Sequence, residues 1–219
     1  MEREYQKITL FNAVTPVAVT SSTDATPIVV TATAHGIKNG QRVLIQGHTT
    51  NLAANGIFIA TAVSANAFTL TDEFTGASVA GSGAGAGSSG LCMVAPQIIL
   101  TKDYRNIILQ FGTSGSATVT VQVYGSVGRP DSQTVALSAR KDMPNFGATV
   151  SPANQYGALQ AIDLDTASAV NGATGFAASG SDILKLYEVN VNIVPYLTAF
   201  PTSWSGGAIT LIAFVANNI

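Results

Sequence analysis

Charged side chains are scarce in this chain of 219 residues: Asp, Glu, Lys and Arg together make up 10% of it, against roughly 25% in ordinary soluble domains. The formal net charge is −2, and the ten basic residues are scattered along the sequence. Because phosphate groups are bound by clustered Lys and Arg, these features argue against a nucleic acid or an anionic membrane as a partner.

Three long stretches carry no charged side chain at all, namely residues 43–71, 74–101 and 189–219. A monomer in water rarely leaves so many positions uncharged, so we expect other subunits to cover part of this surface. An uncharged Thr, Ser and Asn surface is the alternative. The segment 189–219 is the first candidate for a contact surface or a shared core, with the predicted interface residues Val189, Val191, Tyr196, Trp204, Leu211 and Phe214.

Cysteine is almost absent, since Cys92 is the only one. A single cysteine excludes an internal disulfide framework and any zinc site built from several cysteines. Its apolar neighbours predict a buried, inert thiol rather than a nucleophile. The first ten residues lack the apolar core of a signal peptide, and no apolar run approaches the ~20 residues of a membrane span, so we expect synthesis in a cytosol and no membrane partner.

Short runs of β-branched and aromatic residues, separated by Gly, Asn and Asp turn signals, predict an all-β fold. The first part of the chain contributes the runs 27–34, 41–47, 56–64 and 66–72. The second part contributes 95–100, 106–113, 117–127, 183–194 and 208–216. We expect a jelly-roll-like β-sandwich as the main domain and a small β-barrel as a second module.

Two runs of the second part have clearly different faces. Val119, Val121 and Val123 alternate with Thr118, Thr120, Gln122 and Tyr124, and residues 184–193 alternate in the same way. One face of each strand is therefore expected to pack, and the other to be wet or shared with a partner. Helical signals are weak: residues 151–166 could hold one turn, which Gly157 weakens.

The strand predicted over residues 6–14 has no partner before the 27–72 block begins. If it pairs with a strand after residue 93, the block between is an insertion into a larger β domain. We therefore expect a discontinuous main domain of residues 1–20 and 93–219 with 21–92 inserted, against a plain tandem of two domains. The Gly, Ala and Ser-rich tail of the insertion, 76–90, is typical of a flexible connector or a long loop.

His35 and His48 are the only histidines, and their separation of 13 residues matches no common zinc-binding spacing. Each borders a glycine, which places both in turns where histidine is tolerated at strained backbone angles. We expect a scaffolding role or simple exposure, with residues 35–48 forming a hairpin turn and the second strand of the small barrel. The predicted turn-forming residues are His35, Gly36, Asn39, Gly40, Asn55 and Gly56.

Two further groups invite a functional interpretation. Asp163 and Asp165, two apart on a predicted strand, would lie on one face about 7 Å apart, as a carboxylate-based hydrolase requires. Exposed strand or turn aspartates are far commoner than such a pair, so we expect no catalytic residue, cofactor or metal. Trp204 and Tyr196 could form a sugar-stacking surface, although aromatics beside Pro and Gly are more often loop anchors.

Residues 25–72, "ATPIVVTATAHGIKNGQRVLIQGHTTNLAANGIFIATAVSANAFTLTD", resemble a small β module that recurs in phage structural proteins. That module is also similar to the first-catalytic-cysteine half-domain of ubiquitin-activating enzymes. Cys92 lies outside the block, so the resemblance implies no ubiquitin chemistry. It implies instead that the His-Gly and Asn-Gly steps shape turns.

The segments 6–15, 103–127, 154–182 and 187–200 resemble a family of β-rich proteins associated with phage heads or tails. In that family the first strand runs almost directly into the segment that corresponds to "DYRNI", so this chain departs from it by carrying 21–92 between the two. The resemblance implies a structural protein of a tailed-phage virion, assembled in the host cytoplasm. The expected role is capsid decoration, with the major capsid protein, other virion proteins or further copies in a homo-oligomer, such as a trimer, as partners. A tail, baseplate or fibre protein in contact with host glycans is the first alternative.

Overall fold

The computed structural model describes residues 5–73, 75–83, 90–97, 99–101, 104–126, 156–171, 174–191 and 195–216. Strands and turns make up this part of the chain, in which the 3-10 turn η1 (Leu52–Ala54) is the only helical element. The predicted all-β fold class is confirmed. The described residues fall into two compact units: unit 1 holds residues 5–15, 96–126 and 156–216, and unit 2 holds residues 16–95.

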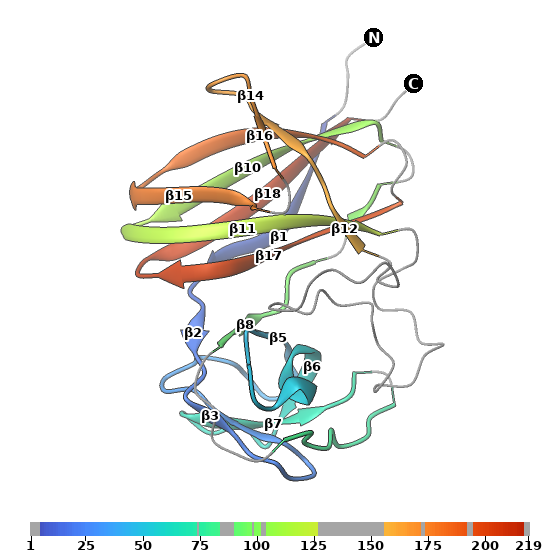
Figure 1. Ribbon diagram of the computed structural model, residues 1–219, viewed down its shortest axis with the longest axis vertical. Coiled ribbons are helices and arrows are strands. Elements are labelled where there is room, and N and C mark those ends of the chain that lie inside the picture. The colour runs from blue at the N-terminus through green and yellow to red at the C-terminus, as the bar shows by residue number, and fades with distance from the viewer. Residues whose placement is uncertain are drawn as a thin grey trace. The chain divides into compact units, whose positions relative to one another are not determined.

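Unit 1 is a sandwich of two antiparallel sheets (Figure 1). The six-stranded sheet has the order β1 (Tyr5–Val14), β18 (Ala208–Ala216), β10 (Asn106–Ser114), β16 (Leu184–Asn190), β13 (Ala161–Asp163) and β14 (Ser168–Val170). The five-stranded sheet has the order β12 (Tyr156–Ala158), β11 (Ser116–Ser126), β17 (Tyr196–Ser205) and β9 (Ile99–Leu100), with β15 (Phe176–Ser181) also paired to β11. Figure 1 shows β11, β15 and β17 as one layer of this unit, in front of β1, β10 and β18.

Eight strands of unit 1 give the sandwich its connectivity: β1, β9, β10, β11, β15, β16, β17 and β18. In chain order, the first, eighth, third and sixth are neighbours in one sheet, and the second, seventh, fourth and fifth are neighbours in the other. This is the jelly-roll arrangement of two Greek keys. The strands of unit 2 lie between β1 and β9 in the chain, and β1 pairs with β18 from Tyr5↔Ala216 to Val14↔Ile209. The insertion hypothesis depended on such a pairing.

The core of unit 1 lies between the two sheets. Val119, Val121 and Val123 of β11 are buried and Thr118 is exposed, so the predicted alternation is confirmed from Thr118 to Val123. Tyr124, predicted for the other face, is also buried. Contact across the core includes Phe176 of β15 and Tyr187 of β16, whose rings stack with centroids 4.0 Å apart. Strand alternation thus supplies one buried face per sheet, as a sandwich requires.

The helical turn considered for residues 151–166 is wrong for the described part, residues 156–166. This part forms β12 and β13 followed by a turn, and β13 is hydrogen-bonded between β14 and β16. Ladder hydrogen bonds therefore outweigh a weak helical preference. The strand predicted over 27–34 is also shorter, Val29–Thr31 (β4), because the backbone turns at Ala34, where φ is +52°.

Unit 2 is one strongly curled sheet. Its order is β2 (Val17–Ala18), β8 (Leu91–Val94), β5 (Arg42–Gln46), β6 (Gly56–Thr61), β7 (Ala67–Thr71), β4 and β3 (Ser21–Ser22). The two edge strands, β2 and β3, belong to the continuous segment 17–22, so the sheet curls back to one stretch of chain. In this segment the N–H of Val19 donates to the carbonyl of Gly90 and that of Thr20 to the carbonyl of Thr31.

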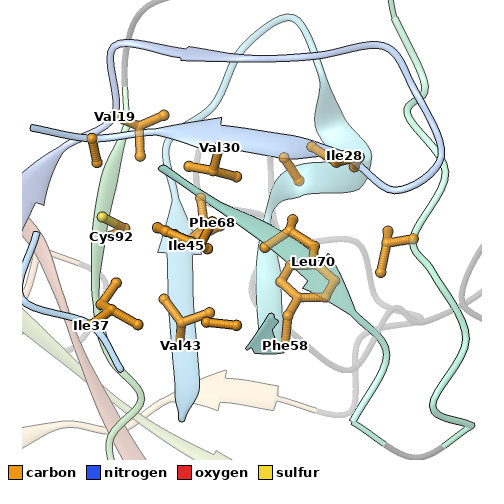
Figure 2. Packing of buried hydrophobic residues seen from close by; sticks show 14 residues of the cluster. Val19, Ile28, Val30, Ile37, Val43, Ile45, Phe58, Phe68, Leu70 and Cys92 are labelled. Carbon is orange, nitrogen blue, oxygen red and sulfur yellow. The ribbon is translucent and has the colours of Figure 1, made fainter. Parts of the chain in front are cut away.

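The inside of this curled sheet is apolar. Figure 2 shows Val30, Ile45, Phe68 and Cys92 gathered in it, and Phe68 and Leu70 have no exposed surface. Val79, from the start of the Gly, Ala and Ser-rich segment, joins this core at 1% exposure. Its backbone exchanges hydrogen bonds with Ile28 and Leu70. Residues 76–83 are therefore a loop that Val79 ties to the core of unit 2, and residues 84–89 lie outside the described residues.

Candidate functional site

The histidine segment does not form a hairpin. β4 and β5 are separated in the sheet by β6 and β7, so the prediction of a hairpin turn over these residues is wrong, although the second strand of the segment is present as β5. The chain crosses between strands that do not pair, which short-range turn signals cannot reveal. Positive φ angles at Gly36 (+66°) and Gly40 (+80°) shape the crossing, where glycine is unstrained.

His35 stabilises this crossing. Its Nδ1 accepts a hydrogen bond from the N–H of Ile37 at 3.0 Å, and its ring meets the ring of Phe68 edge-on, with centroids 5.0 Å apart. At 8% exposure it is buried rather than displayed. Asn39 is exposed next to Gly40.

The Asn55–Gly56 step also has a structural role. The side chain of Asn55 accepts from the N–H of His48 at 2.9 Å and donates to its carbonyl at 2.8 Å, which ties the end of β5 to the start of β6. Gly56 opens β6 with a φ of +144°.

His48 belongs to a buried polar network in unit 2. Its Nε2 lies 2.7 Å from the hydroxyl of Ser22, and Asn51 donates to that hydroxyl at 3.0 Å. Asn51 also donates to the carbonyl of Thr23 and accepts from the N–H of Ser82. His48, Ser22 and Asn51 are each at most 2% exposed. The alternative of a merely exposed His48 is therefore wrong.

The network is built for neutral groups. The imidazole Nδ1 of His48 is buried without a hydrogen bond, and burial lowers the pKa of this histidine from its ordinary value. The serine–histidine contact resembles part of a nucleophilic site, but it lies beneath the surface and its third member is an amide that contacts the serine rather than the histidine. The geometry fits a cross-link between the segments 22–23, 48–55 and 82.

Asp163 and Asp165 form an ionic cluster with Lys185 in unit 1. The Lys185 Nζ lies 3.6 Å from one Asp163 oxygen and 3.4 Å from one Asp165 oxygen. The other Asp163 oxygen accepts from the N–H groups of Asp165 and Thr166 and so closes the turn after β13. The hydrogen bond to Asp165, together with the charge of Asp163, raises the pKa of Lys185. Both carboxylates are thus engaged with a cation, and Asp163 also with the backbone.

Tyr196 and Trp204 cannot form one sugar-stacking surface. They are the first and ninth residues of β17, so roughly 27 Å of extended strand separates them. The indole N–H of Trp204 donates to the carbonyl of Gly207 at 3.1 Å. Trp204 therefore anchors the connection to β18.

The predicted interface residues separate into two groups. Val189, Val191 and Leu211 are at most 1% exposed and belong to the core of unit 1. β16 and β18 turn Val189 and Leu211 toward the five-stranded sheet, and Val191 directly follows β16. Tyr196, Trp204 and Phe214 are partly exposed. The interface prediction therefore narrows to these three, of which Phe214 lies on the other side of the six-stranded sheet from the core.

That other side, which we call the outer face, is apolar over several strands. Strand register assembles one row across it: Lys7 pairs with Phe214, Phe214 with Ile108, Ile108 with Glu188, and Glu188 with Ile162. Leu186 and Leu184 continue the face along β16, and Ile162 and Leu184 are 45% and 61% exposed. We did not identify this face from the sequence, because its members come from five strands, and the apolar residues at alternate positions of β16 were the only local signal.

The outward side of the five-stranded sheet is polar around β11 and β15. Its exposed members there include Thr118, Ser179 and Ser203, and the hydroxyls of Thr118 and Ser179 lie 3.0 Å apart. At its β9 edge the exposed Leu100 pairs with the partly exposed Tyr196, so among the described residues the outer face carries the longer run of large apolar side chains. Exposed apolar faces of this kind are typical of contact surfaces.

Cys92 is buried, as predicted, and burial raises the pKa of its thiol to about 12. It is therefore protonated at neutral pH and packs as a small apolar residue. In the described ranges no three His, Cys, Asp or Glu residues come together as a metal would require. Among the residues that the structure describes, no helix is long and apolar enough to cross a membrane.

Comparison with known proteins finds no match to this chain among protein family models, curated proteins or solved structures.

Proposed function

We propose that this chain is a structural protein of a tailed-bacteriophage virion, and specifically a decoration protein that stabilises the capsid shell through repeated subunit contacts. The observation that carries the proposal is the outer face of unit 1, where Phe214, Ile108, Leu186, Leu184 and Ile162 lie together and partly exposed. Without a partner to cover it, this surface would leave large apolar side chains in contact with water.

The energetics suit a repeated contact. Apolar surface contributes roughly 25 cal/mol for each Å² removed from water, so a face of moderate size gives modest affinity per copy. A shell offers many equivalent positions, and symmetric assemblies gain stability by repeating one such contact. The scarcity of charge supports the same conclusion, because charged side chains are depleted at interface cores.

The fold gives secondary support. Jelly rolls recur in viral capsid and lectin domains, although a fold alone does not define a function. The resemblance of residues 25–72 and of the unit 1 segments to phage virion proteins supports the virion over the lectin alternative. Separation of Tyr196 from Trp204 weakens the argument for glycan contact through those two residues.

The test uses shells assembled with and without the protein. We expect wild-type protein to raise the temperature at which shells break, and the double variant I162E/L184E to bind shells at least about tenfold more weakly, because it places charge in a surface that must lose water. Ser203→Glu, on the outward side of the five-stranded sheet, is the matched control and should bind normally. Cryo-electron microscopy of virions should then place the protein on the capsid lattice; density confined to the tail would contradict decoration and favour a tail protein.

A further inference from the structure

The outer face carries two charges in a self-complementary position. In the row described above, Lys7 on β1 and Glu188 on β16 flank Phe214 on β18 and Ile108 on β10, and Ile162 on β13 continues the row beyond Glu188. The point midway between the two charges therefore falls between β18 and β10, with one apolar residue on each side between it and a charge, and the two charges are opposite in sign.

We propose that the outer face binds the outer face of a second copy of this chain, with a two-fold axis that runs parallel to the strands, between β10 and β18. Such an axis turns each row over onto itself. Lys7 then faces Glu188 of the second copy, Glu188 faces its Lys7, and Phe214 and Ile108 stack crosswise. Two-fold interfaces are self-complementary in this way, because each contact occurs twice.

The neighbouring positions tolerate this arrangement. The next row contains Thr9, Ile212, Gln110 and Leu186, and the row after it Thr210, Gly112 and Leu184. The same axis places Leu186 against Thr9 of the second copy and Ile212 against Gln110. Neither of these rows contains a charge, so no like charges meet. On the opposite side of the first row lie Asn106 and Asn190, both exposed, which suit a polar rim.

The face is large enough for a stable dimer. Four strands at a spacing of ~4.8 Å cover roughly 20 Å, and the paired length of β10 and β18 covers about 30 Å, so the flat area is roughly 600 Å² per copy. Side-chain relief raises the accessible area above this value, toward the ~800 Å² per partner of ordinary specific interfaces. Charge complementarity favours a second copy over an unrelated partner, because the two charges of the row match each other across the axis.

This inference rests on the proposed function and names the subunit contact that the outer face makes there, which is a contact between copies of this chain rather than with the shell itself. Its test is carried out in solution and does not depend on the shell. Sedimentation of the purified full-length chain over a dilution series measures the dimer dissociation constant. We expect K7E and E188K each to raise that constant at least about tenfold, since each change places like charges opposite one another at both of the contacts between residues 7 and 188. An equimolar mixture of the two variants should recover near wild-type affinity as a heterodimer, because every pair across the axis is then of opposite sign. The double variant K7E/E188K should recover it as a homodimer.

The rescue makes the result independent of folding defects, because two misfolded chains do not restore one another. A wild-type chain that stays monomeric at all concentrations would overturn the inference, and so would a dimer in which the variants show no mutual rescue. A dimer with rescue but without any binding to shells would instead contradict the proposed function and leave the inference standing. Binding to shells by a chain that stays monomeric would contradict the inference and leave the proposed function standing.

Discussion

The two units of this protein treat polar and apolar groups in opposite ways. Unit 2 buries polarity: six of the ten buried polar residues of the described chain belong to it, among them Ser22, His48 and Asn51. Unit 1 exposes apolarity: of the five exposed large apolar side chains, Leu100, Ile162, Leu164 and Leu184 are in unit 1, and Leu52 alone is in unit 2.

The difference follows from how each sheet is closed. A sheet that curls back to one segment encloses its own interior, and its buried polar groups then fix which loops meet which strands. A sandwich has two outward sides, and a polar outward side needs no partner whereas an apolar one does. Unit 2 therefore has the character of a self-contained module, whereas unit 1 leaves large apolar side chains exposed.

The largest expected effect tests whether the two units unfold independently of each other. Phe68 has no exposed surface at the centre of unit 2 (Figure 2), and Phe68→Ala should lower the free energy of unfolding of that unit by roughly 3–5 kcal/mol. Trp204 is the only tryptophan and lies in unit 1, so its fluorescence during urea unfolding reports that unit. We expect hydrogen exchange to accelerate in unit 2 while the Trp204 transition stays in place.

Phe111→Ala is the matched substitution in unit 1, where Phe111 is equally buried on β10. It should move the Trp204 transition to lower urea and leave exchange in unit 2 unchanged. Equal movement of both reporters by either substitution would show that the two units unfold together, which would contradict the comparison.

A smaller effect should appear when the pH is lowered. The pKa of His48 is depressed in the folded state, because burial disfavours the charged imidazole. Unfolded chains then bind more protons than folded ones between the ordinary pKa of 6.5 and the depressed value, so stability is complete above pH 6.5 and falls as the pH decreases through this window. A single proton limits the slope to about 1.4 kcal/mol per pH unit.

Hydrogen exchange of unit 2 at a series of pH values, corrected for the intrinsic exchange rate, measures this loss. His48→Gln should remove most of the slope even if it lowers stability throughout, because the slope depends only on the titrating group. A slope of the same size in the Trp204 transition of unit 1 would assign the effect to some other group.

The sequence predicts the strands far better than it predicts the sites. Alternation of apolar and polar residues predicts β11 and β16, because one face of each strand is buried. The strand predicted over 6–14 coincides closely with β1. Short strands such as β13 carry too few residues for a period to show. Their existence depends on the neighbour that supplies the hydrogen bonds, which here is β16.

The sites depend on pairings that join distant segments. Ser22 lies 26 residues from His48, and no local pattern links the two. The row from Lys7 to Glu188 requires the register of four strands, and β1 shifts register between Thr9 and Phe11. Scarce charge predicts a contact surface, whereas the strand register decides which residues are available to form it. This is why Val189 and Leu211 were expected at an interface and are found in a core.

The smallest expected effect concerns ion pairs, which should reflect the same contrast between the units. In unit 2 the Arg42 Nε lies 2.7 Å from a carboxylate oxygen of Glu73, whose side chain is only 9% exposed. In unit 1 the side chains of Lys185 and Asp165 are 30% and 49% exposed, and their contact is 3.4 Å. Exposed pairs are screened by water and salt, whereas a partly buried carboxylate that loses its partner is left poorly solvated.

Lys185→Met should therefore lower the melting temperature of unit 1 only slightly, and molar salt should erase the difference from wild type. Arg42→Met should lower the melting temperature of unit 2 by a larger amount, and molar salt should remove a smaller part of this difference from wild type. Asp163→Asn should also lower the melting temperature of unit 1 by more than Lys185→Met does. The reason is that the Asp163 carboxylate accepts hydrogen bonds from two backbone N–H groups of its turn in addition to contacting the lysine. If Lys185→Met proved the most damaging of the three, the Asp163–Lys185–Asp165 cluster would be a determinant of unit 1 stability, and the conclusion that polar contacts matter chiefly inside unit 2 would fail.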